Sequence, residues 1–296
     1  MDFADFKFGA CVDWVEVRFD VPDPATRRDI EKKFGTGSHA KPLDANEEGY
    51  AHAFIVRIQD PARWADVRQK LDSVRARSVA ATGIEIAFDA YARNPEAGAA
   101  KLPELCAHML KGSRTPYIDA RFMKGGKGTT RTFPRDFAGS IKLFSEDYLL
   151  YLGKLDSSHT QRIYFKTTDK NGKIKLPIKS QRARFENTYL GVSLNGVMSG
   201  SLREIIGDTD FSFREVEYID DKAMLNQILR DSPRINASGR RRTEVGYREH
   251  PLNTKADSAL NDRARDALRR LAKSWAAQDP LQKSGFSDFG PVALSH

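Results

Sequence analysis

Two carboxylates stand on one side of an apolar segment at residues 83–91 (GIEIAFDAY). Apolar side chains occupy every second position there, which predicts a strand with Glu85 and Asp89 together on its other face. Four residues of extended backbone separate the two acids by about 13 Å, so they could bracket an anionic pocket but could not share one ligand atom. An edge strand with a solvated acidic face would show the same pattern, and that alternative stays open.

A second group of charged and aromatic side chains comes from two later segments, residues 162–168 (RIYFKTT) and 181–190 (QRARFENTYL). The side chains that alternate with apolar neighbours, and so share a strand face, are Arg162, Tyr164, Lys166, Arg182, Arg184 and Glu186. If the two strands pair, their polar faces adjoin and form a patch that would suit a phosphodiester. Charged faces of exposed strands are commonly only solvated, which is the competing interpretation.

The segments that must position these side chains alternate between strand and helix up to residue 111. Strands are predicted where apolar and polar residues alternate, and helices where apolar residues recur at intervals of three and four. The predicted strands are residues 11–19, 50–59 and 83–91, and the predicted helices are residues 24–34, 64–77 and 95–111. The stretch between the first helix and the second strand, residues 35–48, is predicted to be a loop.

The chain changes character beyond residue 115. Gly-Gly, Gly-Thr-Thr and Phe-Pro sequences within residues 115–144 are typical of hairpins and loops. Strands are predicted at residues 148–153, 162–168 and 181–190, helices at 202–206, 220–229 and 257–277, and a partly flexible basic linker at 232–254. The basic face of the last helix could contact a DNA backbone or a partner, or could simply be solvated.

The composition is that of a globular protein with an excess of positive charge. Its 296 residues include 48 Lys and Arg against 40 Asp and Glu, which gives a net charge of +8. This excess favours phosphate contacts, although many basic proteins bind no nucleic acid. The two cysteines, Cys11 and Cys106, lie in apolar contexts and predict small buried side chains. With no leader-like segment and no run of about 18 apolar residues, a cytoplasmic protein without membrane contact is expected.

Four short motifs in the second half of the chain occur in a characteristic order. Residues 151–153 (YLG) are followed by Ser157-Ser158, then by residues 162–166 (RIYFK), then by residues 184–186 (RFE). The series resembles the Y-x-G, S, R-x-Y-x-K, R-x-E motifs of the replication initiation factor family. That family serves rolling-circle plasmids and filamentous phages.

Two earlier segments agree with this resemblance. Residues 12–15 (VDWV) resemble the opening strand of the family, and residues 83–89 (GIEIAFD) resemble its R-I-D-L-A-x-D strand. The similarity covers about residues 11–190. Gly83 stands where the family has Arg, Glu85 stands where it has Asp, and residues 207–296 match no part of the pattern.

The resemblance implies an α+β fold. The expected architecture is an antiparallel β-sheet with helices packed on one face, of the HUH or RRM-like kind and with a duplicated arrangement as an option, followed by a C-terminal helical segment. Enzymes of the HUH kind use a divalent cation, Mg²⁺ or Mn²⁺, to polarise a scissile phosphate while a tyrosine attacks it. The tyrosine keeps the 5′ phosphate covalently bound, which conserves the bond for resealing.

The resemblance also implies roles for individual residues. The candidate metal ligands are Glu85, Asp89 and Glu186. The candidate phosphate and DNA contacts are Arg162, Arg182 and Arg184, with Lys166 also counted as catalytic, and the basic run that begins at Lys124 adds Lys124, Lys127 and Arg131. The sequence contains no His-x-His pair, so the metal ligands would be carboxylates, and His52 is interpreted as a core residue.

Tyr189 is the expected nucleophile, because it lies just beyond Glu186 where the family carries its tyrosine. Strict alternation would turn Tyr189 away from Glu186 unless the strand bends or ends at Asn187. A structural aromatic on the sheet is the alternative interpretation of this residue.

The predicted organisation is a catalytic domain at residues 1–206 and a basic, helical segment at residues 207–296. The predicted function is a sequence-specific nickase that starts rolling-circle replication of a phage, plasmid or integrated element. Its partners would be origin DNA, a host helicase and a second copy in a homodimer. Two rivals stay open: a non-catalytic DNA-binding protein of the same fold, and an RNA-binding protein or ribonuclease that stacks bases on its tyrosines.

Overall fold

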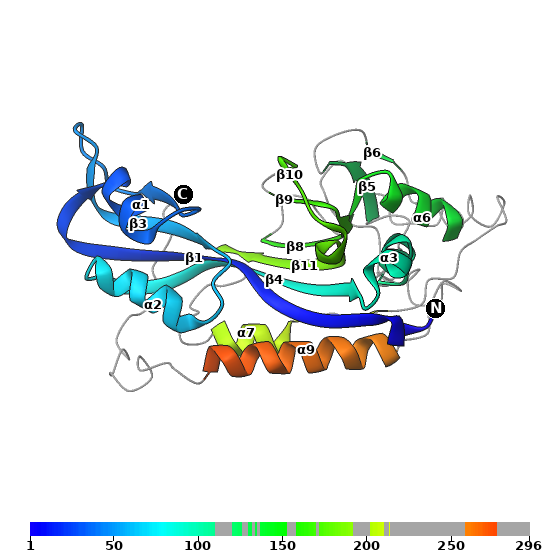
Figure 1. Cartoon of the computed structure of the whole chain (residues 1–296). Coiled ribbons are helices and arrows are strands. Elements are labelled where there is room, and N and C mark those ends of the chain that lie inside the picture. The colour runs from blue at the N-terminus through cyan, green and yellow to red at the C-terminus, as the bar shows by residue number, and fades with distance from the viewer. Residues whose placement is uncertain are drawn as a thin grey trace, which may run out of the picture. The chain divides into compact units, whose positions relative to one another are not determined.

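The computed structural model describes residues 1–109, 120–125, 130–131, 134, 137–152, 158–169, 172–191, 202–209, 213 and 258–276. The predicted helix at 220–229, the linker at 232–254 and Lys127 lie outside these residues. Within the described part, the strands form a nine-stranded sheet in the order β2-β3-β1-β4-β11-β8-β7-β5-β6 and a two-stranded sheet, β10-β9 (Figure 1). The strand pairs with a defined register are antiparallel. The predicted α+β class with an antiparallel sheet is confirmed.

The chain divides into two compact units, each assembled from three segments. Unit 1 comprises Met1–Gly9, Phe88–Glu186 and Asp210–Arg265, and unit 2 comprises Ala10–Ala87, Asn187–Thr209 and Asp266–His296. The division cuts strands β1, β4 and β11. The domain boundary after residue 206 stays a prediction.

Unit 2 carries a β-α-β-β-α-β sequence of elements. In chain order they are β1 (Phe6–Thr26), α1 (Arg27–Phe34), β2 (His39–Pro42), β3 (Tyr50–Gln59), α2 (Trp64–Ser73) and β4 (Arg77–Ala92). The strand order β2-β3-β1-β4 places β1 and β3 at the centre, as in split βαβ folds. The unit also contains α7 (Leu202–Asp208) and the second half of α9 (Ser258–Ala276).

The core of unit 2 lies between its sheet and helices α1 and α2. On β1, Val17 and Phe19 are fully buried, and the ring of Phe19 stacks on Phe34 of α1 at 5.5 Å between centroids. Trp64 of α2 packs on Trp275 of α9 at 6.2 Å. Apolar residues two apart on the strand therefore define one buried face, and their neighbours point to the other face.

Two predictions in this region are wrong, one about where a helix begins and one about a segment predicted to be a loop. The helix expected from residue 24 begins at Arg27, because Thr26 and Asp29 form a capping box that starts it there and β1 continues up to Thr26. The loop expected at residues 35–48 contains β2, whose Ala40 pairs with Val56 and is buried. A four-residue strand is too short to show a readable alternation.

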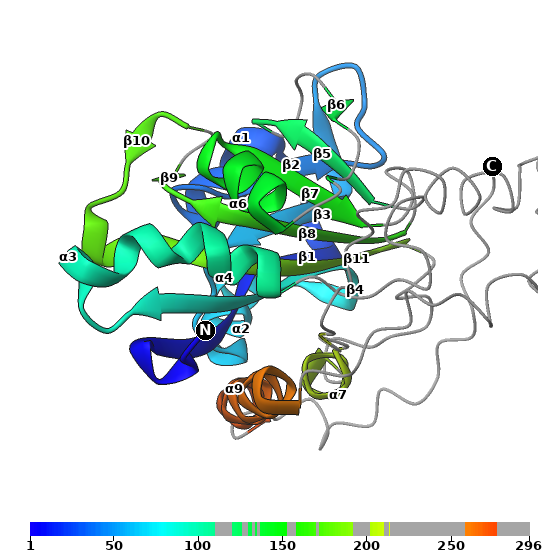
Figure 2. The same ribbon diagram turned by 90° about the vertical axis from the view of Figure 1, so that its right-hand side faces the viewer.

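Unit 1 combines short strands with helices. Its elements are η1 (Phe3–Asp5), α3 (Pro95–Gly98), η2 (Ala99–Lys101), α4 (Leu102–His108), β5 (Ala120–Lys124), β6 (Thr130–Arg131), α6 (Phe137–Ser145), β7 (Tyr148–Leu152), β8 (His159–Lys166), β9 (Thr168–Asp169), β10 (Ile174–Lys175), η3 (Ile178–Ser180) and most of β11 (Arg182–Leu190). Figure 2 shows α4 and α6 side by side. The hairpin-and-loop prediction for residues 115–144 missed α6, whose Phe144 packs on Phe122 at 5.2 Å.

The helices of unit 1 cover the apolar face of its strands. Phe122, Leu150 and Ile163 are direct cross-strand partners, so they share the face on which α6 packs. On β11, Phe185 belongs to the same apolar side and packs on Phe213 at 5.3 Å. The side chains that alternate with these along each strand point to the opposite face. They include the charged side chains of β8 and β11.

The C-terminal helix α9 lies within the range predicted for it. Its buried residues are Leu260, Ala264, Ala267, Leu268, Leu271 and Trp275, spaced as on one helical face. In unit 1, Asn261 donates to the carbonyl of Phe213 and accepts from its backbone N–H. No helix among the described residues is both long and apolar enough to cross a membrane.

Candidate functional site

Arg184 of β11 and Asp89 of β4 form a buried, two-pronged ion pair. Arg184 Nε lies 2.6 Å from Asp89 Oδ1, and Arg184 Nη2 lies 2.7 Å from Oδ2. Arg182 adds a third contact, with its Nε 3.3 Å from Asp89 Oδ2. Both members of the central pair are almost fully buried, at 2% and 5% side-chain exposure. The Asp89 carboxylate is therefore held by guanidinium groups on both of its oxygens.

Glu186 collects three partners from β8 and β11. Arg162 Nη2 lies 2.6 Å from Glu186 Oε2, and the Tyr164 hydroxyl donates to Oε1 at 2.6 Å. Arg184 Nη1 approaches the same Oε1 at 3.4 Å. The structure thus brings together the polar faces of the two segments that the sequence singled out. Arg184 links the two acids, because it contacts Asp89 and Glu186 at once.

Burial changes the protonation chemistry of this cluster. Removal from water and the negative charge of Glu186 raise the pKa of Tyr164 well above its ordinary value, so the phenol is protonated at neutral pH. The adjacent carboxylates of Asp89 and Glu186 keep the pKa of Arg184 raised, against the opposing effect of burial. A positive guanidinium and a neutral phenol therefore face Glu186.

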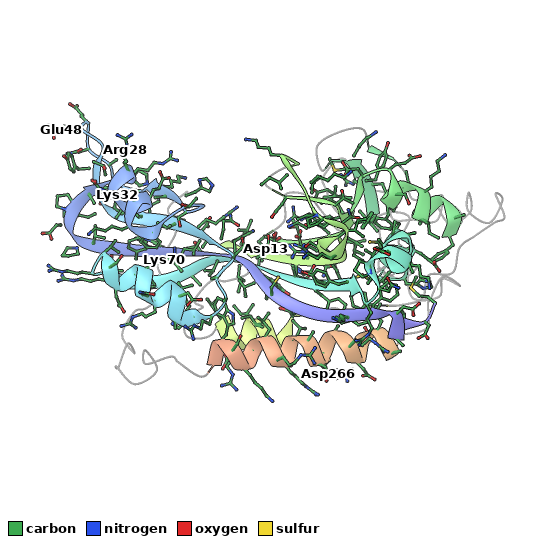
Figure 3. All side chains as sticks on the ribbon, viewed as in Figure 1. Asp13, Arg28, Lys32, Glu48, Lys70 and Asp266 are labelled. Atoms are coloured by element: carbon green, nitrogen blue, oxygen red, sulfur yellow. The ribbon has the colours of Figure 1, made fainter. Side chains whose placement is uncertain are left out.

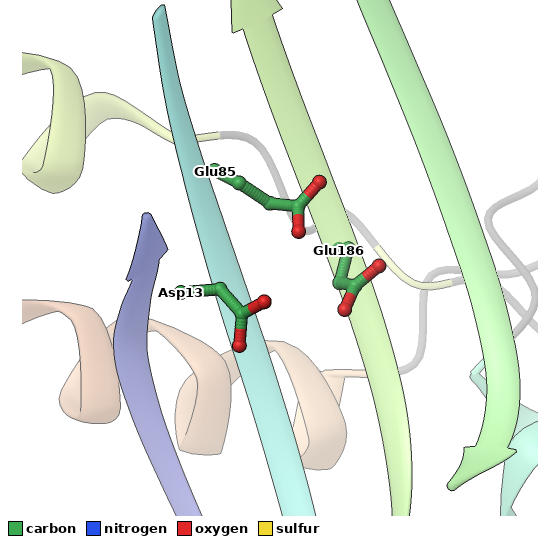
Figure 4. A group of neighbouring side chains, drawn as sticks. All are labelled: Asp13, Glu85 and Glu186. Carbon is green, nitrogen blue, oxygen red and sulfur yellow. The ribbon is translucent and has the colours of Figure 1, made fainter. Parts of the chain in front are cut away.

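Three carboxylates come close enough to hold a cation. One oxygen each from Asp13, Glu85 and Glu186 lies within 4.8 Å of the others (Figure 4). They come from β1, β4 and β11, and the carboxylate of Glu85 also accepts a hydrogen bond from the Thr188 hydroxyl. Carboxylates this close repel one another unless positive charge compensates; Arg162 and Arg184 supply it at Glu186, and a cation would supply it for the group as a whole. Mg²⁺ and Mn²⁺ prefer such hard oxygen ligands. The donor set fits a divalent cation.

Asp13 is the site residue that sequence reasoning missed. It was part of the VDWV segment but was given no role. The signal that could have found it is its position in residues 11–19, where strict alternation puts this carboxylate in one column with Val15 and Val17. A carboxylate in an apolar column needs a partner, which makes it a candidate for a buried site.

Of the three predicted metal ligands, Glu85 and Glu186 belong to the acidic group and Asp89 does not. The Asp89 oxygens are instead bound by Arg184 and Arg182. Its role as a ligand stays a prediction. Asp89 and Arg184 are 95 residues apart in the sequence, which explains why their pairing could not be predicted from it.

The expected nucleophile, Tyr189, lies on a strand that does not end at Asn187. β11 continues to Leu190, and Thr188 contacts Glu85 on the side of Glu186. Alternation along an unbroken strand turns Tyr189 to the other face. The phenol that does contact Glu186 is Tyr164.

The remaining predicted DNA contacts are more dispersed. Lys166 is mostly buried and lies 3.5 Å from Asp169. Lys124 is exposed at the end of β5, with its Nζ 5.9 Å from the ring centre of Tyr148. Arg131 belongs to β6, and its side chain lies outside the described part, as does all of Lys127. Their contacts with DNA stay predictions.

No protein-family model and no curated protein matches the sequence. Among solved structures, the chain is similar to a rolling circle replication initiator protein from Geobacillus stearothermophilus. The two share 12% sequence identity, with a TM-score of 0.34 over 92% of this chain and 100% of that chain. A TM-score this low does not establish a shared fold, so the function is argued from the residues of the site.

Proposed function

We propose that this protein is a metal-dependent DNA strand transferase that nicks one strand at an origin to start rolling-circle replication. The observation that carries the proposal is the contact of the Tyr164 hydroxyl with Glu186 at 2.6 Å, because Glu186 is also a member of the three-carboxylate group. A phenol beside a cation-binding carboxylate and two arginines is the set of groups that tyrosine-mediated phosphoryl transfer needs. The resemblance to the replication initiation factor family supports the same reaction.

In the proposed reaction Tyr164 is the nucleophile. Its oxygen forms a bond to the scissile phosphorus, the bond from phosphorus to the 3′ oxygen breaks, and the 5′ phosphate stays on the protein. Glu186 would take the phenolic proton, since it already accepts that hydrogen bond. The leaving 3′ oxygen takes one proton from water and ends as a hydroxyl, and Glu186 returns its proton to solvent. Arg162, which lies partly exposed at 28%, is placed to contact the phosphate as charge develops.

Asp13, Glu85 and Glu186 would hold the Mg²⁺ or Mn²⁺ ion. Bound there, the cation would supply polarisation of the phosphate oxygens. Asp89 and Arg184 have a different part in this proposal. Their buried pair fixes the guanidinium that touches Glu186, so they position the carboxylate without contacting the substrate.

The test uses a supercoiled plasmid that carries the gene with its flanking DNA, incubated with the protein and Mn²⁺. The expected result is relaxation of the plasmid with a covalent 5′ adduct, and peptide mass spectrometry locates the nucleotide on Tyr164. The variant Y164F should give no adduct, and Y189F should react as the wild type does. An adduct on Tyr189 would restore the nucleophile that the family resemblance suggests and would move the chemistry away from Tyr164. Binding without any adduct would support a non-catalytic DNA-binding protein.

A further inference from the structure

Among the described residues, the sheet of unit 2 has an outer face on the side away from α1 and α2. Helices α1 and α2 pack on the side of Val17 and Phe19, so the alternate residues of the strands point the other way. The register gives two successive rows on this outer face, which are Glu16-Arg57-His39 and Arg18-Ile55-Lys41 across β1, β3 and β2. Four of these six side chains are basic.

Beside these rows, Trp14 and Arg57 are layered over Gly83 of β4. A Cβ at Gly83 would lie only 2.8 Å from Trp14 Cζ3, so the indole ring rests directly on the Gly83 backbone. The guanidinium of Arg57 lies over the same ring, 3.9 Å from its centroid. This packing gives a physical reason for glycine at the position where the family pattern has Arg, since any side chain there would displace Trp14.

The outer layer of the stack is accessible. Trp14 is 7% exposed, whereas the Arg57 side chain is 36% exposed and is held in place by Glu16 at 3.1 Å. A planar guanidinium fixed on an indole and partly exposed to solvent is a surface on which a nucleobase can stack. Duplex DNA offers no free base plane to such a surface, so the geometry favours single strands.

Basic side chains flank this stack on the same face. Lys41 and His39 are exposed on β2, and Arg18 is half-buried on β1. The acids of β1 on this face are Glu16, which is already paired with Arg57, and Asp20 at its far end. Glu85 of β4 lies on the same face and is buried. Basic groups spread along two neighbouring rows suit the phosphates of an extended strand.

We propose that this outer face of unit 2 binds single-stranded DNA, with one base stacked on Arg57 and the adjoining phosphates on Arg18 and Lys41. The inference rests on the proposed function for its choice of DNA as the ligand. Gly83 and Glu85 are two residues apart on β4 and share a face. Gly83, on which Trp14 and Arg57 are layered, therefore lies about 7 Å along the strand from Glu85, a proposed metal ligand. A strand held there would lead towards the carboxylate of Glu85.

The experiment is a fluorescence-anisotropy titration of the full-length protein with a labelled oligothymidylate of about 16 nucleotides, without divalent cation so that no strand is cut. The variant R57K keeps the positive charge but replaces the planar guanidinium by an ammonium group. It should weaken binding about tenfold, as loss of one stacked base does. The pair R18A/K41A should lower the slope of log affinity against log salt by about 1.4, since each single-strand phosphate contact contributes about 0.7. Thermal unfolding of each variant checks that it is folded.

The matched control is R28A/K32A, which removes the same charge from α1 on the helical side of the unit, where Figure 3 labels both residues. Binding that falls in the control while R57K and R18A/K41A bind as the wild type would overturn the proposal. So would equal affinity for a duplex of the same length, or tighter binding of oligouridylate, which would make RNA the occupant. The titration without divalent cation measures binding alone and the plasmid assay measures the covalent adduct, so a failure of the strand-transfer chemistry and a failure of this surface give different results.

Discussion

Two arginine–carboxylate pairs with similar closest distances lie in very different surroundings. On α1, Arg27 Nε is 2.9 Å from Glu31 Oε1 with 60% and 28% of the side chains exposed. Between β4 and β11, Arg184 Nε is 2.6 Å from Asp89 Oδ1 with 2% and 5% exposed. Water screens the first pair and is excluded from the second. Burial, far more than distance, decides what each pair does for the protein.

The buried pair is the one that can organise chemistry. Arg184 cannot reorient without leaving the Asp89 carboxylate uncompensated, so the guanidinium that touches Glu186 is fixed in advance. The outer face of unit 2 differs, because Arg57 is held by Trp14 and Glu16 and yet its side chain stays 36% exposed. Cutting a DNA strand requires a rigid interior site. Holding the strand requires an accessible binding surface.

The largest effect is expected from Arg184→Met. The substitution leaves the buried Asp89 without its main partner, so the free energy of unfolding should fall by about 3–5 kcal/mol. Urea denaturation followed by circular dichroism measures the change. A loss below about 1 kcal/mol, the value typical of exposed pairs, would show that the pair is not buried as described.

Cation binding should distinguish the acidic group from ordinary surface carboxylates. Mn²⁺ at a hundred times its dissociation constant should stabilise the wild type by about 2.7 kcal/mol, which calorimetry records as a higher Tm. The variants D13N, E85Q and E186Q should lose most of this shift, while D72N on α2, a carboxylate that is 60% exposed, should keep it. If E186Q kept the full Mn²⁺-induced rise in Tm, Glu186 would not be a ligand of the metal.

Tyr164→Phe should have a moderate effect on stability at neutral pH. The change removes a hydrogen bond to a buried carboxylate, which costs about 1–3 kcal/mol. Chemical denaturation at pH 7 compares it with Tyr50→Phe, where the tyrosine is 41% exposed and no change is expected. Equal stabilities of the two variants would argue against the contact with Glu186.

The same pair of variants tests the raised pKa of Tyr164. Below the ordinary value of 10.0 the phenol is protonated in both states and adds no pH dependence. Above it the unfolded chain releases a proton that the folded chain keeps, so stability should fall by up to about 1.4 kcal/mol per pH unit until the folded pKa is reached. Y164F should lack this part of the decline, and Y50F should show it in full.

The smallest effect is expected at the exposed pair. Arg27→Met on α1 should change the free energy of unfolding by about 0.3–0.5 kcal/mol, the usual value for a helical pair four residues apart. Denaturation under the conditions used for Arg184→Met gives the direct comparison. A loss as large as that of Arg184→Met would erase the distinction between the two pairs.

The sequence predicted those parts of the fold whose information is local. Residues 50–59 were assigned as a strand with the bounds of β3, because alternation is clear there and Asp60-Pro61 stops it. Helix α6 was missed because Gly and Pro signals before it obscured a short apolar stripe that includes Phe144. Strand β2 was missed because four residues carry too little pattern.

The candidate site shows the same limit. The polar faces of residues 162–168 and 181–190 were predicted to adjoin if their strands paired, and Tyr164 does reach Glu186. Which carboxylate meets which arginine depends on register between strands far apart in the chain, and local periodicity carries no information about it. The partners of Asp89 could therefore not be predicted from the sequence, whereas Asp13 had a local signal as a carboxylate among the apolar residues of its strand face.

The most direct test of the central idea is a crystal structure of the protein with Mn²⁺, with data collected at the manganese absorption edge. An anomalous peak bound by oxygens of Asp13, Glu85 and Glu186, with the Tyr164 hydroxyl beside it, is the expected result. A peak at Asp89, or none near Glu186 at saturating Mn²⁺, would contradict it.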